Sequence, residues 1–157
     1  MPHTHPPEPR ETRSFRSPLW RKILGMFVGL CLAVMVVVMV QAVGHRIWPL
    51  PQGVDFRDAE QVAALVRALP AGALLWVAFS YFAGTLAGAY VALIIARDAW
   101  ASTWPAVAVE GVLLAFGVLN LMALPHPAWF WVTALASFPL GAFVAIRLAR
   151  RTSTRVP

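Results

Sequence analysis

The stretch ILGMFVGLCLAVMVVVMVQAV, residues 23–43, decides the fold class. It has no charged side chain, and Gln41 is its one strongly polar residue. A helix needs about 20 such residues to cross a bilayer. A secretory signal peptide is the rival interpretation, because residues 42–44 (AVG) resemble a cleavage site. The apolar region exceeds the roughly 7–15 residues of a signal core, so we predict a retained membrane helix at residues 22–43.

Three further apolar stretches follow, and we place membrane helices at residues 71–97, 104–124 and 127–148. The whole chain is 59% hydrophobic and 13% charged, whereas soluble domains are about 45–50% apolar and about 25% charged. The excess apolar surface must therefore face lipid. The connections between neighbouring stretches after residue 97 are short, so those helices must be antiparallel. The sequence predicts an all-α membrane protein with four transmembrane helices.

The longest connection, residues 44–70, is predicted to be an outer loop containing a short amphipathic helix at residues 58–69. Asp58 can cap this helix, and Gln61 follows three positions later, as in a capping box. One helical face is apolar and contains Val62, Leu65, Val66 and Leu69. A helix with one apolar face and one charged face is typical of the membrane surface, where we expect this segment to lie.

The ends of the chain are predicted to be tails around one domain. Residues 1–19 contain five prolines among polar residues, a composition that favours a disordered tail. Residues 20–150 form the single transmembrane domain, and residues 151–157 form a second tail. Basic residues are enriched on the cytoplasmic side of membrane proteins, and placing both tails in the cytoplasm puts ten of the thirteen Lys and Arg residues there.

The net charge of +6 does not indicate a nucleic-acid-binding protein. The basic residues flank the apolar stretches, and no aromatic side chains interleave them as a base-stacking surface requires. We expect the chain to contact the lipid bilayer instead. The candidate protein partners are another membrane protein or further copies of this chain.

Residues 88–97 (GAYVALIIAR) closely match residues 141–150 (GAFVAIRLAR), with six identical positions. The second and fourth predicted helices therefore look like copies, which predicts a duplicated helical hairpin and a parallel internal repeat. Convergence is the alternative, because apolar helices draw on few residue types. Either origin leaves the activity open.

Glu110 is the strongest candidate for an intramembrane polar site. It lies six residues past Trp104, about 9 Å along a helix, and ionisable residues at such depth are functional candidates by default. Tyr90 lies at a similar depth on the second predicted helix, so its hydroxyl could donate to Glu110. The functional interpretation is a proton- or cation-binding carboxylate, and the structural one is a carboxyl group that ties helices together.

Other polar and small residues are predicted to pack helices. Asn120 and Thr133 lie at similar distances from the 125–127 turn, so they could form a hydrogen bond across the hairpin that ties the two helices together. Small residues four apart let helix backbones approach closely. Two such patterns occur: Gly25 with Gly29, and Ser80 with Gly84 and Gly88.

The sequence predicts no enzyme, metal site or cofactor site. It contains no catalytic triad, paired carboxylates, phosphate-binding loop or HExxH motif. Cys31, Met35 and Met39 share one helical face and could pass Cu(I), but thioethers also fill helix interfaces without any metal. The four histidines are all outside the predicted membrane helices, which argues against haem.

Residues 69–75 (LPAGALL), 120–130 (NLMALPHPAWF) and the loop 51–58 resemble a family of small, uncharacterised bacterial membrane proteins with four transmembrane helices. The resemblance covers roughly residues 44–150. It implies a bacterial plasma-membrane location and carries over no catalytic residue, because the shared motifs concern packing and turns.

Polar residues inside the predicted helices are few, and small-residue patterns are abundant. We therefore expect a non-enzymatic accessory protein or packing partner within a membrane assembly. The alternative is a small transporter or channel that is built on the duplicated hairpin and uses Glu110 for proton or cation coupling.

Overall fold

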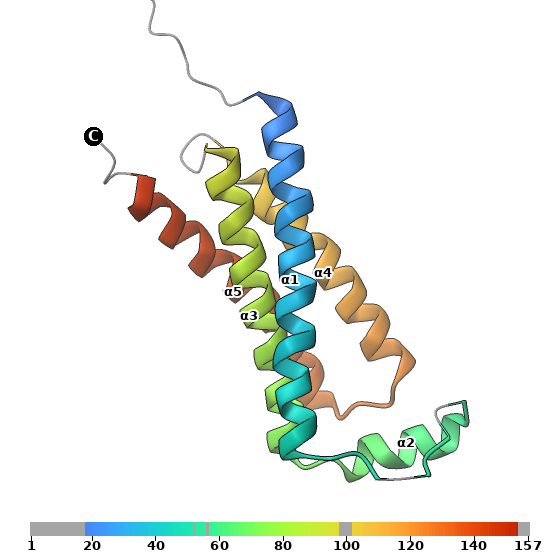
Figure 1. The fold of residues 1–157 in the computed structure, drawn as a ribbon. Helices are drawn as coiled ribbons and strands as arrows, with labels where there is room; N and C mark the ends of the chain where they lie inside the picture. Colours follow the sequence, from blue (N-terminus) through green and yellow to red (C-terminus); the bar gives the residue numbers. More distant parts are fainter. Residues whose placement is uncertain (1–17, 52, 56, 98–101, 154–157) are drawn as a thin grey trace, which may run out of the picture.

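The computed structural model describes residues 18–51, 53–55, 57–97 and 102–153. These residues form five helices and no strand (Figure 1). The helices are α1 (Leu19–Ile47), α2 (Ala59–Ala68), α3 (Ala71–Ala96), α4 (Trp104–Ala123) and α5 (Ala128–Ser153). All except α2 are long and apolar enough to cross a membrane, which indicates a multi-pass membrane protein and confirms the predicted fold class. The outer parts of the predicted tails, residues 1–17 and 154–157, lie outside the described residues.

Two helices extend further than predicted, because a helix that leaves the membrane need not end at its first charge. α1 continues through His45 and Arg46, and α5 continues through Arg150 and Arg151. Basic side chains near a helix C-terminus interact favourably with the helix dipole. α1 ends at Ile47, and its cap residue Trp48 leaves the helical conformation because the following Pro49 disfavours helical backbone there.

The helix α2 begins at the predicted cap. The Asp58 carboxylate accepts hydrogen bonds from the backbone N–H groups of Glu60 and Gln61, and from the side-chain amide of Gln61 at 3.0 Å. These bonds lower the pKa of Asp58 below its ordinary value of 3.8, and the bond from the Gln61 side chain has the largest effect. In a capping box the Gln61 side chain would accept from the cap residue itself; here its oxygen accepts from the backbone N–H of Asp55.

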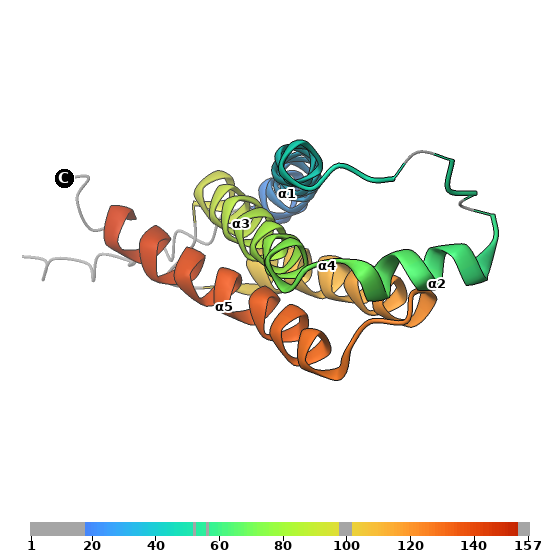
Figure 2. The same cartoon turned by 90° about the horizontal axis from the view of Figure 1, so that it is seen from below.

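The spanning helices are arranged around α3, which packs against α1, α4 and α5. Viewed along the bundle, α3 lies between α1 and α5, whose backbones do not meet (Figure 2). The start of α1 and the end of α5 lie at the same end of the bundle, and α2 crosses the opposite end (Figure 1). The bundle therefore has one end with both described termini and one end with α2.

The contact between α1 and α3 is made by small residues. A Cβ atom placed on Gly25 would lie 2.6 Å from the carbonyl oxygen of Ala92. A Cβ atom on Gly88 would lie 2.5 Å from the carbonyl oxygen of Gly29. The two backbones are thus in direct contact, as small residues four apart permit. We call this interface the glycine seam; it contains Gly25, Gly29, Gly84 and Gly88.

The opposite side of α3 packs against α5. A Cβ atom on Gly141 would lie 2.7 Å from the carbonyl oxygen of Phe82 and 3.0 Å from the Cβ of Thr85. Thr85 is fully buried, and its hydroxyl has no hydrogen-bond partner within the described structure. Its buried position follows from the close approach of the two helices at Gly141.

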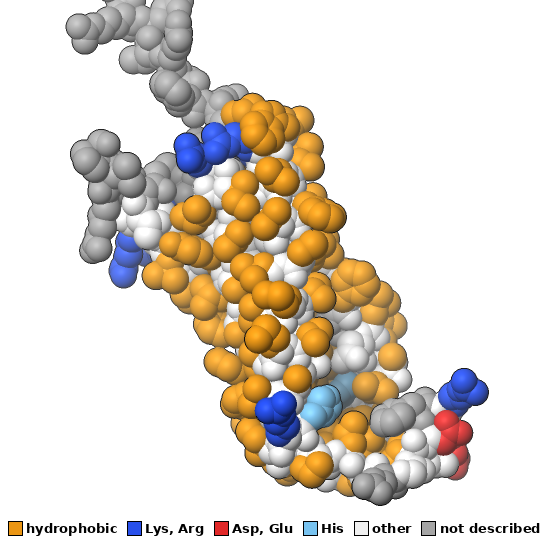
Figure 3. All heavy atoms as spheres, in the orientation of Figure 1, with side chains coloured by type: hydrophobic (Ala, Val, Ile, Leu, Met, Phe, Trp, Pro, Cys, Tyr) orange, Lys and Arg blue, Asp and Glu red, His pale blue; other side chains and the backbone are white. Residues whose placement is uncertain are grey.

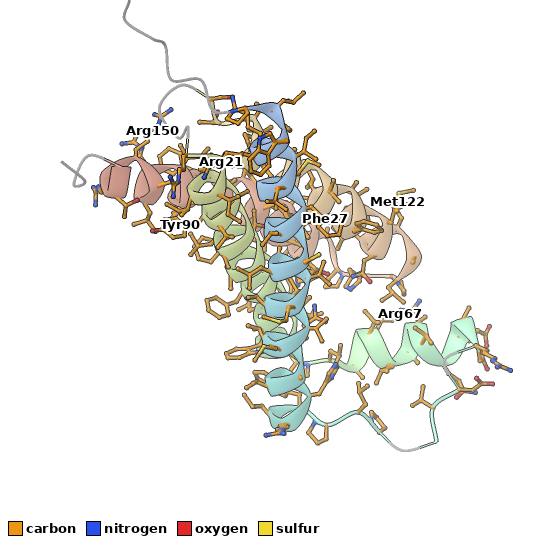
Figure 4. The ribbon with its side chains drawn as sticks, turned by 45° about the horizontal axis from the view of Figure 1, so that its top comes forward. Arg21, Phe27, Arg67, Tyr90, Met122 and Arg150 are labelled. Atoms are coloured by element: carbon orange, nitrogen blue, oxygen red, sulfur yellow. The ribbon has the colours of Figure 1, made fainter. Side chains whose placement is uncertain are left out.

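The face shown in Figure 3 is predominantly apolar between the two ends of the bundle, and all four spanning helices carry exposed large apolar side chains. Phe27 is 64% exposed and Met122 is 71% exposed, and both project outward (Figure 4). Arg21 and Arg150 lie at one end, whereas Arg67 lies on α2 at the other (Figure 4). Exposed apolar surface on this scale is typical of a membrane or protein interface, and its charged borders fit the two surfaces of a bilayer.

Candidate functional site

Four polar side chains of the bundle meet at one level of α3. On one side, the Gln41 amide of α1 donates to the Ser80 hydroxyl at 3.2 Å, and that hydroxyl donates to the Val77 carbonyl at 2.6 Å. On the other side, the Asn120 amide of α4 donates to the Tyr81 hydroxyl at 3.0 Å. Because Ser80 and Tyr81 are adjacent, these bonds join three helices in a single layer.

Tyr81 is the centre of this layer. Its side chain is buried, and its ring stacks on Phe138 of α5 with centroids 4.9 Å apart. Gly117 of α4 admits the Phe138 ring, because a Cβ atom there would lie 2.5 Å from the ring. The position of the Tyr81 hydroxyl is therefore fixed by contacts with both α4 and α5.

A groove opens onto this layer between α1 and α4, which leans away from α1 toward the α2 end (Figure 1). Its volume is about 380 Å³. The lining is almost entirely apolar, with the Tyr81 and Asn120 side chains as its polar elements. We call it the α1–α4 groove; it is lined by Val34, Val37, Val38, Tyr81, Leu113, Phe116, Gly117, Asn120 and Phe138.

Asn120 has unused hydrogen-bonding capacity in this groove. A carboxamide offers two N–H donors and an acceptor oxygen, and the described residues supply one partner, the Tyr81 hydroxyl. The Asn120 side chain is exposed. The groove therefore presents a polar group to whatever fills it, and hydrocarbon cannot form a hydrogen bond with that group.

Asn120 and Thr133 do not bond to each other, so the predicted hydrogen bond across the α4–α5 hairpin is wrong. The Thr133 hydroxyl donates to the Trp129 carbonyl one turn earlier in its own helix, at 3.0 Å. Asn120 bonds instead to Tyr81 of α3. Equal distance from the turn sets the depth of a residue but not the direction in which its side chain points.

Glu110 and Tyr90 are not joined by a hydrogen bond in the described part of the structure. Tyr90 packs against a cluster of buried apolar residues from three helices, which includes Ala106 of α4 and Ala145 of α5. Glu110 is partly exposed at the edge of the buried face of α4, next to buried Val109. The predicted link between the two side chains is therefore not formed.

The sequence analysis did not identify Gln41 and Tyr81 as members of the polar layer. Gln41 was visible as the one strongly polar residue of its helix, and Ser80 as a small residue of the second helix. Matching polar residues by depth between these helices would have paired them. No comparable sequence signal identifies Tyr81, whose role depends on the position of the Phe138 ring.

The described residues contain no group of three or more His, Cys, Asp or Glu side chains that could hold a metal ion. What the layer offers is hydrogen bonding at the floor of an apolar groove. No family model, curated protein or solved structure matches the chain.

Proposed function

We propose that this chain is a non-enzymatic accessory protein of a bacterial plasma-membrane assembly, and that its α1–α4 groove receives a transmembrane helix of the partner. The observation that carries the proposal is the exposed Asn120 carboxamide at the edge of an otherwise apolar groove. A lipid chain can fill such a groove but cannot hydrogen-bond the amide. A helix that carries a polar side chain can do both.

The shape of the groove favours a helix that has small residues. Val34 and Val38 are exposed on α1, and Phe116 is exposed on α4. Without a hydrophobic driving force in lipid, helices associate through close packing and hydrogen bonds between side chains. The expected partner helix therefore has small residues at the level of the valines and a hydrogen-bonding side chain opposite Asn120.

The proposed orientation places both termini in the cytoplasm. Lys22, Arg147 and Arg151 belong to the ends of α1 and α5, which lie together at one end of the bundle (Figure 1). Arg46 and Arg67 belong to the opposite end. The larger basic cluster is expected on the cytoplasmic side, so α2 and the groove's wider end face outward.

Affinity purification in mild detergent, followed by mass spectrometry, tests this function. Val38→Trp fills the groove with a large ring, whereas Val132→Trp adds the same ring to the exposed surface of α5, where Val132 is 72% exposed. We expect one partner to copurify with the wild type and with Val132→Trp, and to be lost from Val38→Trp. Recovery of the same proteins with all three chains would contradict the proposal.

A small transporter or channel is the second candidate, and the feature that favours it is Glu110. This carboxyl group lies within α4, is partly exposed and has no hydrogen bond to the described residues. Proton-linked solute flux in liposomes would support this candidate. A duplicated hairpin assembled into a homo-oligomer would then supply the pathway.

A further inference from the structure

A second pocket lies at the α2 end of the molecule, where α2 leads into α3 and meets the α4–α5 turn. Its volume is about 480 Å³, within the range of about 300–1,000 Å³ of small-molecule sites. It is separate from the α1–α4 groove and shares no residue with it. The lining residues are Val66, Arg67, Leu69, Ala71, Leu74, Pro125, His126, Pro127 and Trp129.

The position of this pocket corresponds to the border between the hydrocarbon and the headgroups. Ala71 and Trp129 stand at the first turns of α3 and α5, and Trp129 is 43% exposed. Tryptophan prefers this level because its ring is apolar and its N–H needs a partner. Buried Leu74 continues the wall toward the apolar band. The pocket therefore has an apolar side and a polar rim.

The α4–α5 turn offers an anion no free backbone N–H group, so binding on this side of the pocket depends on side chains. Pro125 and Pro127 have no backbone N–H, and the N–H of His126 already donates to the Leu124 carbonyl at 2.8 Å. Arg67 is exposed and forms no ion pair with the residues that the structure describes. It projects from α2 toward the bundle (Figure 4). A guanidinium with this freedom is suited to bidentate binding of a phosphate.

The hydrogen-bonding role of His126 determines which second chemical group of a ligand fits beside the phosphate. Its Nδ1 lies 3.1 Å from the Leu124 carbonyl oxygen, and a carbonyl oxygen can only accept, so Nδ1 carries the hydrogen. The neutral ring then has an acceptor at Nε2. The ring also packs at a tilt against Phe130, with centroids 4.9 Å apart. An acceptor beside a cation suits a headgroup that has both a phosphate and a hydroxyl donor.

We propose that this pocket binds the headgroup of a glycerophospholipid from the surrounding leaflet. Arg67 holds the phosphate, His126 accepts a hydrogen bond from a headgroup hydroxyl, and Leu74 and Trp129 contact the first methylene groups of the acyl chains. A free phosphate would leave that apolar wall without a partner. The site would hold α2 against the membrane through a bound lipid.

Native mass spectrometry of the full-length protein with added phosphatidylglycerol tests the site. Arg67→Gln removes the charge, and Ala71→Leu fills the pocket while every charge remains. Arg57→Gln is the matched control, because Arg57 is an exposed arginine before α2 that does not line the pocket. We expect Arg67→Gln to weaken lipid binding at least about fivefold, the effect of about one basic contact at a charged membrane surface. Ala71→Leu should also weaken binding, because the leucine side chain occupies the pocket. Arg57→Gln should bind as the wild type does.

Three results would overturn the proposal. Equal losses in Arg67→Gln and Arg57→Gln would mean that general surface charge attracts the lipid. Competition by soluble glycerol 3-phosphate at the same concentration as the lipid would mean a site for a free phosphate ester. Retained binding in Ala71→Leu would place the lipid elsewhere on the surface, which also contradicts the assignment.

Discussion

The two sides of α1 show how differently one helix can pack. Toward α3 it presents Gly25 and Gly29, and the two backbones touch. Toward α4 it presents Val34 and Val38, and a groove remains between the helices. Small residues thus close one interface completely, whereas branched side chains and the tilt of α4 leave the other open. The same helix therefore makes a permanent contact with α3 on one side and offers a surface for a partner on the other.

The largest expected effect comes from Gly88→Leu, which breaks the closed side. The new side chain would meet the carbonyl oxygen of Gly29 and the Cβ of Ala33, and the helices would have to separate. Overpacking of this kind costs about 3 kcal/mol, so we expect a large loss of thermal stability in detergent. Gly111→Leu is the control, because a Cβ atom at Gly111 meets nothing within 4 Å. Equal stability of the two variants would contradict the observed seam.

Thr85→Val should act in the opposite direction. Valine has almost the same shape as threonine and removes a buried hydroxyl that has no partner in the described structure. An unsatisfied buried polar group costs about 1–3 kcal/mol, so we expect a gain in unfolding free energy of about 1 kcal/mol. Thr133→Val is the matched control, because the Thr133 hydroxyl is bonded to the Trp129 carbonyl, and it should give no gain. A loss of stability in Thr85→Val would indicate a partner for the hydroxyl.

Tyr81→Phe probes the open side by removing the acceptor of the Asn120 bond. Hydrogen bonds between membrane helices contribute about 0.6 kcal/mol on average, and the ring stacked on Phe138 remains. We therefore expect a small fall in the unfolding free energy, measured by reversible denaturation in mixed micelles. Tyr90→Phe should leave stability unchanged, because no hydrogen bond of the Tyr90 hydroxyl is present in the described structure. A larger fall in Tyr90→Phe than in Tyr81→Phe would reverse the roles of the two tyrosines.

Glu110→Gln should have the smallest effect on stability. The carboxyl group is partly exposed and unbonded among the described residues, and surface changes of this kind stay within about 0.5 kcal/mol. Thermal stability in detergent and proton-linked flux in liposomes should both match the wild type. Normal stability with lost flux would instead favour the transporter. Lost stability would mean that the charge itself has a cationic partner.

Much of the fold follows from hydrophobic length and turn chemistry. Four apolar stretches predict the spanning helices, and Asp58 with Gln61 predicts the start of α2. The contacts between side chains were harder to predict. The depth of a residue in the membrane does not determine how its helix is rotated about its own axis, so it does not determine which neighbour the side chain meets. Asn120 shows this: its depth suggested Thr133, but its direction gives Tyr81. The duplication of the second and fourth helices stays a prediction, as does the cytoplasmic placement of both termini.

Site-specific photo-crosslinking in intact cells tests the central claim most directly. A photoreactive phenylalanine analogue at position 116 would lie in the α1–α4 groove, and one at position 143 would lie on α5; Phe116 is 66% exposed and Phe143 is 54% exposed. We predict that position 116 crosslinks to one transmembrane segment of a different protein, identified by mass spectrometry, and that position 143 reacts only with lipid. Crosslinks from position 116 to lipid alone, or to a second copy of this chain, would contradict the account.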